Sequence, residues 1–519
     1  MTVFERVVAR MSEPSFYSPP PARVDVRETH VSVVFLAGDR AYKLKKPVRT
    51  PFLDYSTLEL RRRFCGEEVR LNQRFAPDIY LGMRSIAEHG AELALADPDH
   101  ASAVEYAVVM RRFDEQQTLE HLIEHKSADA PLVERVGTHV AELHLAAPRA
   151  PAGYWTPAYV GERLEENFDT TRSEVGTLLD RLTFDSVRRF SRAFLGAHED
   201  LLKQRVAAGM VRDVHGDLRA GHIVIEAREL SIVDCVEFDE RMRRIDVAAD
   251  LAFLTMDLER LGVLPLAKRV EHAYVARTGD AELHYLLPFY ACYGAWVRGK
   301  VTTLRIHQLP DRDPGRPELE QRARELFALA LRLAWRARLP LLLVLCGVAG
   351  SGKSTLAADL SRRSGLPHLS SDHVRKELAG ISPNTRGSQE LYTPELTTRT
   401  YRELATRASA ALEESGGAIV DATFHRREQR ALLQDTGART LWVECTAPEH
   451  VLRSRGAARE RRPELASDAA WPVIEAQLSA WEPLSDVSRG DHLAVPTDQA
   501  VEACLDELDS FVSAAVDHG

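Results

Sequence analysis

The fold of the C-terminal third is decided by residues 341–363, which read LLLVLCGVAGSGKSTLAADLSRR. The apolar run 341–346 predicts a buried strand, and TLAADLSRR predicts a helix. Between them lies G-x-x-x-x-G-K-S, a loop whose backbone N–H groups and following helix N-terminus suit phosphate binding. The stretch therefore predicts an α/β domain, a parallel sheet flanked by helices, with ATP bound at this phosphate loop.

The predicted nucleotide site consists of this loop and the first helical turn. Lys353 is expected to reach the β- and γ-phosphates and to act in phosphoryl transfer, and Ser354 is expected to supply an oxygen to Mg²⁺. The residues expected to bind the cofactor are Gly347, Val348, Ala349, Gly350, Ser351, Gly352, Lys353, Ser354 and Thr355.

A carboxylate beside the phosphate loop is predicted from residues 368–377, HLSSDHVRKE. A short strand is expected to bring Asp372 to its C-terminal end, where the carboxylate can accept or orient the proton of a substrate hydroxyl. Arg375, one helical turn later, can bind an anionic group. The alternative is a helix-capping aspartate followed by a surface arginine.

A second carboxylate ends the strand predicted from GGAIVDATF, residues 416–424. Asp421 is expected to organise Mg²⁺ and water, with a simple strand-end turn residue as the alternative. Residues 453–462, RSRGAARERR, place five arginines on a helix and its exit. These arginines predict either a lid that closes over the phosphates or a solvated helix face.

Together these motifs resemble the small P-loop kinases of the zeta-toxin, polynucleotide-kinase and gluconate-kinase type, over about residues 340–510. In those families an aspartate contacts the substrate hydroxyl and an arginine holds a phosphate. The resemblance implies that Asp372 and Arg375 take these two catalytic roles. It does not identify the substrate, because the acceptors of these families range from sugars to polynucleotide ends.

A domain boundary is expected just before this strand. Residues 307–318, HQLPDRDPGRPE, predict a loop, and a helix is expected from 318 to about 338. We therefore predict one domain over 1–337 and a second over 338–519. In the first, residues 24–112 predict strands around one helix at 67–75, and residues 118–335 predict mostly helices, which together make an α+β domain of two lobes.

The first domain carries its own candidate site. His215-Gly216-Asp217 precedes a short strand, and a second short strand, LSIVD, ends at Asp234. Two aspartates at the ends of adjacent strands suit phosphoryl transfer, since one can take or orient the acceptor proton while the other holds Mg²⁺.

This pattern resembles the aminoglycoside-phosphotransferase branch of the protein-kinase-like fold, over about residues 25–300. The resemblance implies that Asp217 is catalytic and that Asp234 binds the metal. It also implies a strand lysine that pairs with the ATP phosphates and a helix glutamate as its partner. Lys43 and Lys45, on one face of a predicted strand, are the candidates for the lysine, and Glu67 and Glu68 for the glutamate.

The sequence departs from this family at the second metal position. His222 stands where the family usually has asparagine, and histidine is a less usual ligand for Mg²⁺. This departure implies either a kinase with altered metal use or a degenerate domain that binds a ligand without turning it over.

Composition narrows the class of protein. The 519 residues carry a net charge of −10, which argues against a general nucleic-acid binder. The six cysteines are far apart and form no C-x-x-C pair, so neither a zinc site nor a disulfide framework is expected. The first residues do not resemble a signal peptide, and no apolar run approaches the ~20 residues that span a bilayer, so we expect a cytoplasmic protein.

The leading interpretation is a phosphotransferase with two domains, each using Mg²⁺ and ATP to phosphorylate a hydroxyl group of a small molecule such as a sugar, an aminoglycoside or a related metabolite. The first alternative is a P-loop kinase whose N-terminal domain senses a ligand or binds a partner. The second is a kinase that processes nucleic-acid ends, which the negative net charge disfavours.

Overall fold

A computed structural model describes residues 2–29, 31–50, 53–90, 92–227, 229–382, 389–434, 436–460 and 471–517. It divides into two compact units. The N-terminal unit comprises residues 1–163 and 199–319, and the C-terminal unit comprises residues 164–198 and 320–519. The C-terminal unit thus includes a segment from within the predicted first domain, and the single boundary at 338 stays a prediction.

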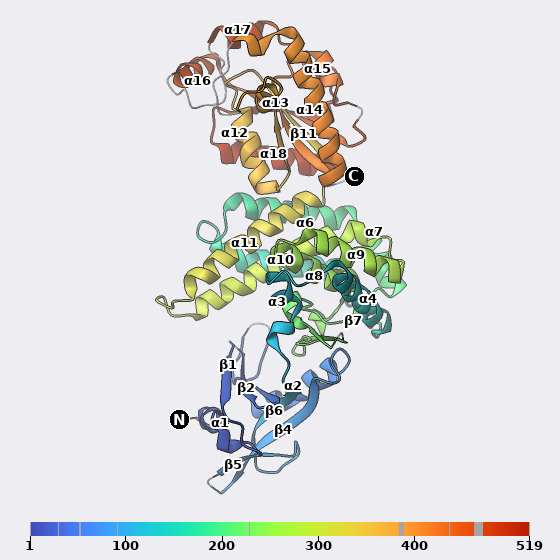
Figure 1. Ribbon diagram of the computed structural model, residues 1–519, viewed down its shortest axis with the longest axis vertical. Helices are drawn as coiled ribbons and strands as arrows, with labels where there is room; N and C mark the ends of the chain where they lie inside the picture. The colour runs from blue at the N-terminus through green and yellow to red at the C-terminus, as the bar shows by residue number, and fades with distance from the viewer. Residues whose placement is uncertain are drawn as a thin grey trace. The chain divides into compact units, whose positions relative to one another are not determined.

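The N-terminal unit begins with a six-stranded antiparallel sheet in the order β1-β2-β3-β6-β4-β5 (Figure 1). Helix α1 packs through Val7 and Met11 on one face, and α2 packs through Cys65 on the other. Thr57 caps α2 by accepting from Leu60 N, so this helix begins earlier and ends earlier than predicted. The bounds are α1 Val3–Met11, β1 Val24–Glu28, β2 Ser32–Ala37, β3 Arg40–Lys45, α2 Leu58–Asn72, β4 Tyr80–His89, β5 Glu92–Ala96 and β6 Ala103–Arg111.

The rest of this unit is mainly helical, which confirms the predicted two-lobed α+β domain. Two short strand pairs, β7 with β10 and β8 with β9, carry the loops of the candidate site. The bounds are α3 Leu119–Glu124, α4 Ala130–Ala146, α7 Glu199–Ala208, β7 Val211–Asp213, β8 Ile223–Glu226, β9 Glu229–Ile232, β10 Arg244–Asp246, α8 Val247–Arg260, α9 Leu264–Thr278 and α10 Leu283–Gln308; α5, Pro157–Thr171, runs from this unit into the other.

The C-terminal unit is built on a five-stranded parallel sheet in the order β12-β13-β11-β14-β15, which confirms the predicted α/β architecture. All six residues of the central strand β11 are buried, as their apolar character predicts. The bounds of the elements in this unit are α6 Arg181–Ala197, β11 Leu341–Cys346, α12 Lys353–Ser364, β12 His368–Ser370, α13 Ser371–Leu378, α14 Pro394–Ser415, β13 Gly417–Asp421, α15 Arg427–Ala431, β14 Arg439–Thr446, α16 Glu449–Glu460, α17 Trp471–Ser479, β15 His492–Pro496 and α18 Val501–Val516; α11, Arg316–Arg336, begins in the N-terminal unit and continues into this one.

The register of the sheet aligns the ends of three strands. Ser370 of β12 and Leu345 of β11 both pair with Asp421, the last residue of β13. The carboxyl ends of these parallel strands therefore meet at one edge, where ligands of open α/β sheets bind. No helix in the described part of the chain is long and apolar enough to cross a membrane.

Candidate functional site

The small lobe of the N-terminal unit places a lysine between two carboxylates. Lys43 of β3 donates from Nζ to Glu68 Oε1 of α2 at 2.8 Å and to Asp234 Oδ1 at 2.7 Å. Glu68 is fully buried, whereas Glu67 turns to Arg70 at 2.7 Å. Of the two predicted glutamates, Glu68 is therefore the one that meets the lysines.

Lys45 binds the other oxygen of the same glutamate, but it lies deeper. Its Nζ is 2.6 Å from Glu68 Oε2 and also binds Glu237, which accepts from the Tyr55 hydroxyl at 2.5 Å. The Lys45 side chain is 2% exposed and that of Lys43 is 16% exposed. This difference favours Lys43 as the lysine that faces a ligand.

Helix α8 holds the loop that carries Asp217 through hydrogen bonds to its backbone. Asp250 of α8 accepts from His215 N at 3.1 Å and from Gly216 N at 2.8 Å. Gly216 has φ +84°, and a Cβ there would meet Met242 O at 2.7 Å, so only glycine fits without displacement. The hydrogen bonds to Asp250 and the close packing of Gly216 against Met242 O together fix the backbone next to Asp217.

The Asp217 carboxylate is bound by two arginines that are not among the residues predicted from the sequence. Arg219 lies 3.0 Å from Oδ2, and Arg298 Nη1 of α10 lies 3.8 Å from Oδ1. Burial alone would raise the pKa of Asp217, but interactions with Arg219, His222 and Arg298 outweigh it and hold the pKa below its ordinary value. Arg219 could have been found from its place in the motif; Arg298 has no comparable signal, because only folding brings α10 to this loop.

His222 lies at the predicted metal position as a neutral ring. Burial, followed by the charge of Arg219, lowers its pKa to about 4. Nδ1 is 3.0 Å from Asp217 O, which assigns the proton to Nδ1 and leaves a lone pair on Nε2. Nε2 accepts from Arg219 Nη2 at 2.6 Å and lies 3.8 Å from Asp234 Oδ2, so His222 and Asp234 converge.

This pair can contribute to a divalent-cation site only with other ligands. Among the described residues, no group of three or more His, Cys, Asp or Glu side chains is placed to hold a metal ion. Mg²⁺ commonly keeps several waters and binds through one or two carboxylates plus phosphate oxygens. Asp234 fits that role, since the charge of Lys43 lowers its pKa far below the ordinary value and keeps it ionised.

The phosphate loop of the C-terminal unit has the backbone that its glycines predict. Gly347, Gly350 and Gly352 have φ of +141°, +88° and +87°. A Cβ on Gly347 would meet Cys445 O at 2.5 Å and Ser351 Oγ at 2.7 Å. Because α12 begins directly at Lys353, the loop and the positive helix end form a cradle that fits phosphate oxygens.

Asp421 lies beside this cradle, at the end of β13, and is 1% exposed. Its Oδ2 is 3.3 Å from His368 Nε2, and Oδ1 has no hydrogen-bond partner within the described part of the chain. Burial raises its pKa, but hydrogen bonds from His368 and Ser354 and the charge of Lys353 lower it overall. A buried, ionised carboxylate with one unpaired oxygen next to Ser354 fits a Mg²⁺ site.

Asp372 lies two residues beyond the end of the strand that was predicted to end at it. The strand β12 ends at Ser370, so Asp372 is in the first turn of α13 and not at a strand end. Burial and the charge of Asp421 raise its pKa, against the opposing charges of Lys353 and Arg375. Asp372 is therefore close enough to Lys353 and Asp421 to be affected by their charges, and its role as a base beside the phosphates stays a prediction.

Arg375 is buried and anchors neighbouring structure. Its Nη1 donates to Leu391 O and to Thr397 Oγ1, both at 3.1 Å, and its guanidinium lies 4.8 Å from the Tyr392 ring centroid. Nε has no partner among the described residues. Its predicted binding of an anionic group stays a prediction.

The arginine-rich segment splits into different roles. Arg455 braces the phosphate loop, since its Nη1 lies 3.0 Å from Gly350 O and 3.1 Å from Thr497 Oγ1. Arg453 pairs with Glu449 and stacks on Trp471 at 3.8 Å. The side chain of Arg459, and both Arg461 and Arg462, lie outside the described residues, so the predicted lid is untested.

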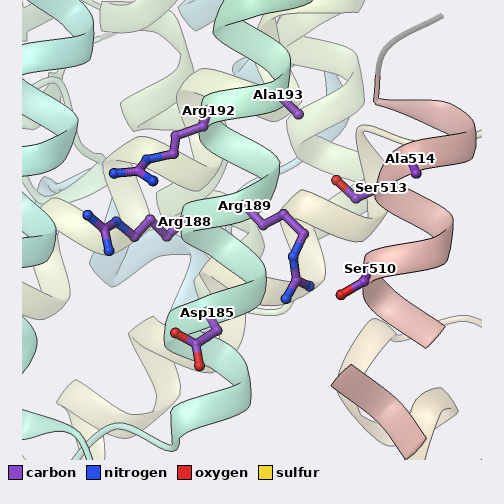
Figure 2. Close-up of a pocket in the computed structure, with 8 residues that line it drawn as sticks. All are labelled: Asp185, Arg188, Arg189, Arg192, Ala193, Ser510, Ser513 and Ala514. Carbon is purple, nitrogen blue, oxygen red and sulfur yellow. The ribbon is translucent and has the colours of Figure 1, made fainter. Parts of the chain in front are cut away.

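A pocket of about 540 Å³ lies away from these groups, between α6 and α18 (Figure 2). Arg188 and Arg192 bind Glu165, whereas Arg189 binds Asp506 and Asp509. Its arginines are thus already neutralised, and it contains no predicted site residue. The lining consists of Asp185, Arg188, Arg189, Arg192, Ala193, Ser510, Ser513 and Ala514.

The fold and these two sites define a kinase-type enzyme. Comparisons with known proteins show what the chain is similar to. A family described as "AAA domain" matches residues 342–484. Shikimate kinase of Geobacter sulfurreducens is 30% identical over 172 residues, 33% of this chain and 89% of that enzyme. A choline/ethanolamine kinase family protein from Mesorhizobium loti, whose structure is solved, covers 64% of this chain and 99% of its own, at 13% identity and a TM-score of 0.38.

A relative that spans both units defines the family. The "Uncharacterized protein Rv2004c" of Mycobacterium tuberculosis is 32% identical over 470 residues, which cover 88% of this chain and 91% of that protein. The chain belongs to the family of Rv2004c, and the similarity extends over both units of this chain.

Proposed function

We propose that the chain is an ATP- and Mg²⁺-dependent phosphotransferase that phosphorylates hydroxyl groups of small molecules, such as a sugar, an aminoglycoside or a related metabolite. ATP would bind at the phosphate loop and also at the N-terminal site. The observation that carries the proposal is that each unit brings together residues suited to phosphoryl transfer: Lys353, Ser354, Asp421 and Asp372 in one unit, and Lys43, Glu68, Asp217 and Asp234 in the other.

At the C-terminal site, Lys353 and the loop amides would bind the phosphates, and Ser354 with Asp421 would hold Mg²⁺. Asp372 would orient the acceptor hydroxyl and take its proton, which its raised pKa favours. When bound, Mg-ATP supplies the phosphoryl group and spreads the charge that develops on it. The residues thus contribute positioning and charge neutralisation.

At the N-terminal site, Glu68 would hold Lys43 toward the phosphates, and Asp234 would bind the metal with His222 beside it. Asp217 would orient the acceptor hydroxyl. The pairing of Lys43 with both Glu68 and Asp234 supports a preformed nucleotide site, because each partner restrains the lysine from a different element.

The test separates the two sites within the full-length chain. Lys353→Ala and Asp217→Asn, alone and combined, would be incubated with Mg-ATP and a panel of sugars, aminoglycosides and nucleosides, with products identified by mass spectrometry. We expect each single variant to lose one phosphorylated product by about 100-fold or more. Arg362→Ala, a 73% exposed side chain on α12, is the matched control. Undiminished transfer in the double variant would remove both assignments.

A second candidate is a catalytic C-terminal unit joined to a ligand-sensing N-terminal unit. It is favoured by the two arginines on Asp217 and by His222 at the metal position. If the Lys353→Ala chain binds ATP but transfers phosphate to no acceptor, and Asp217→Asn changes nothing further, this second function replaces the first for the N-terminal unit.

A further inference from the structure

Arg298, from the distant helix α10, lies beside Asp217, the residue proposed to orient the acceptor hydroxyl in the N-terminal site. We infer that this site phosphorylates a hydroxyl group on an acceptor that also carries a negative charge, a carboxylate or a phosphate, close to that hydroxyl. The inference rests on the proposed function of Asp217 and adds the substrate class.

Both oxygens of Asp217 face a guanidinium group. Arg219 Nε and Nη2 lie 3.1 Å and 3.0 Å from Oδ2, and Arg298 Nη1 lies 3.8 Å from Oδ1. Arg219 belongs to the same loop, whereas Arg298 projects from α10, where its side chain is 19% exposed. An acceptor hydroxyl must approach one of these two oxygens to transfer its proton, so it must come close to a guanidinium.

The two arginines lie at different oxygens of Asp217 and come from different elements. Arg219 also binds His222 Nε2 at 2.6 Å, and His222 lies beside Asp234, so Arg219 is on the metal and phosphate side. Arg298 meets the other carboxylate oxygen. The Arg298 guanidinium is therefore positioned to bind a negatively charged group on the acceptor. A planar guanidinium binds carboxylate or phosphate oxygens through paired hydrogen bonds.

The surroundings of Asp217 disfavour a cationic acceptor. The side chains that act most strongly on its carboxylate are Arg219, His222, Arg298 and His215. A polyamine acceptor would bring its ammonium groups against two guanidinium groups, and like charges at such distances repel. An anionic acceptor would instead replace part of the contact between Arg298 and Asp217 and free that oxygen for the hydroxyl.

The reaction balances without a further reagent. The acceptor oxygen bonds to the terminal phosphorus of ATP as the bond from that phosphorus to the ADP oxygen breaks, and Asp217 accepts the hydroxyl proton and releases it to water. Arg298 remains bound to the anionic group and does not exchange a proton, since arginine stays charged.

The test uses the full-length Lys353→Ala chain, so that transfer reports on the N-terminal site. Acceptors come in matched sets with one carbon skeleton: glycerol, glycerate and glycerol 3-phosphate; glucose, gluconate and glucose 6-phosphate; kanamycin is the polycation. Products are identified by mass spectrometry, and kcat and KM are measured by ADP release. We expect an anionic member of a set to exceed its neutral partner in kcat/KM by about tenfold or more.

Substitutions at Arg298 then locate the preference. Arg298→Gln should raise KM for the anionic acceptor by about tenfold and leave the neutral acceptor nearly unchanged, and Arg298→Lys should restore part of the loss. Calorimetric titration with the same acceptor, without ATP, should show the same weakening. Arg305→Gln, an exposed arginine on the same helix, should behave like the parent.

The outcomes separate this inference from the proposed function. Preferred phosphorylation of neutral acceptors or kanamycin, lost in Asp217→Asn, would overturn the inference and leave the function standing. Faster transfer to every acceptor in Arg298→Gln would also overturn it. In that case the ion pair with Arg298 would only reduce the ability of Asp217 to accept a proton. Transfer to no acceptor in any set would count against both.

Discussion

Asp217 and Asp372 have the same proposed task in opposite surroundings. Arginine side chains hold the pKa of Asp217 below its ordinary value, whereas burial and the neighbouring Asp421 raise the pKa of Asp372. A carboxylate that accepts a proton must be ionised, so each residue stops working when it becomes protonated. The difference gives the two sites distinct responses to acid.

We predict that transfer at the C-terminal site is lost at a higher pH than transfer at the N-terminal site. As pH falls, Asp372 is protonated first because its pKa is raised, while Asp217 stays ionised below the ordinary aspartate value. The measurement is kcat/KM against pH. The Asp217→Asn variant reports on the C-terminal site, and the Lys353→Ala variant reports on the N-terminal site. Coincident or reversed acidic limbs would contradict the assigned bases.

The two strand lysines should separate into a functional and a structural residue. Lys43→Met should lower kcat/KM for ATP at the N-terminal site by about 100-fold, because Lys43 is the lysine that faces the ligand. Lys45→Met should lower the free energy of unfolding by about 3–5 kcal/mol, since it leaves Glu68 and Glu237 buried together without their shared cation.

Steady-state kinetics in the Lys353→Ala background and urea unfolding followed by circular dichroism measure the two effects. Lys203→Met, whose side chain is 56% exposed, is the control and should change neither quantity appreciably. If Lys45→Met folds as stably as the parent and loses ATP use, the two roles are exchanged.

At the scale of elements, the strand–loop–helix around Gly347 explains why one short stretch predicts a site. The strand is apolar throughout, the loop needs glycine where φ is positive, and the helix starts at Lys353. These requirements are local, so residues adjacent in the sequence are enough to predict the strand, the loop and the helix. Asp372 shows the limit: a strand that ends two residues earlier moved it onto a helix, because strand ends depend on pairing with β13.

Gly347→Ala tests the closeness of this packing. The added Cβ meets Cys445 O at 2.5 Å and Ser351 Oγ at 2.7 Å, so the loop or β14 must move. We expect a loss of about 1–3 kcal/mol in stability and of most ATP turnover at the C-terminal site. Gly456→Ala, where the nearest atom is Ile474 Cδ1 at 3.5 Å, should preserve turnover. Urea unfolding and ADP release in the Asp217→Asn background provide the readouts.

For the molecule as a whole, a buried ion network ties three distant segments of the C-terminal unit together. Arg338 follows α11 and binds Asp517 at 2.9 Å and Asp509 at 2.8 Å. Asp509 of α18 also binds Arg189 of α6. The network thus links α6, in the segment 164–198, to the C-terminal end of the same unit.

Arg338→Ala should weaken this unit. The substitution leaves Asp517 without the arginine that binds it and Asp509 with Arg189 alone, all in a site where Arg338 is 1% exposed. We expect the free energy of unfolding to fall by about 3–5 kcal/mol. Arg362→Ala, which removes a surface pair with Asp359, should cost less than about 1 kcal/mol. Equal urea midpoints for the two variants would show that the network contributes little.

The sequence by itself determined the α/β and two-lobed α+β architectures and the phosphate loop, because each depends on residues near in the chain. It also predicted the roles of Asp217 and Asp234, and these roles stay predictions. Only the tertiary structure decided between Glu67 and Glu68, brought Arg298 to Asp217 and joined residues 164–198 to the C-terminal unit. These contacts depend on which face of a helix is buried and against what. Packing and charge interactions with elements distant in the sequence decide these contacts, and the local sequence does not encode such interactions.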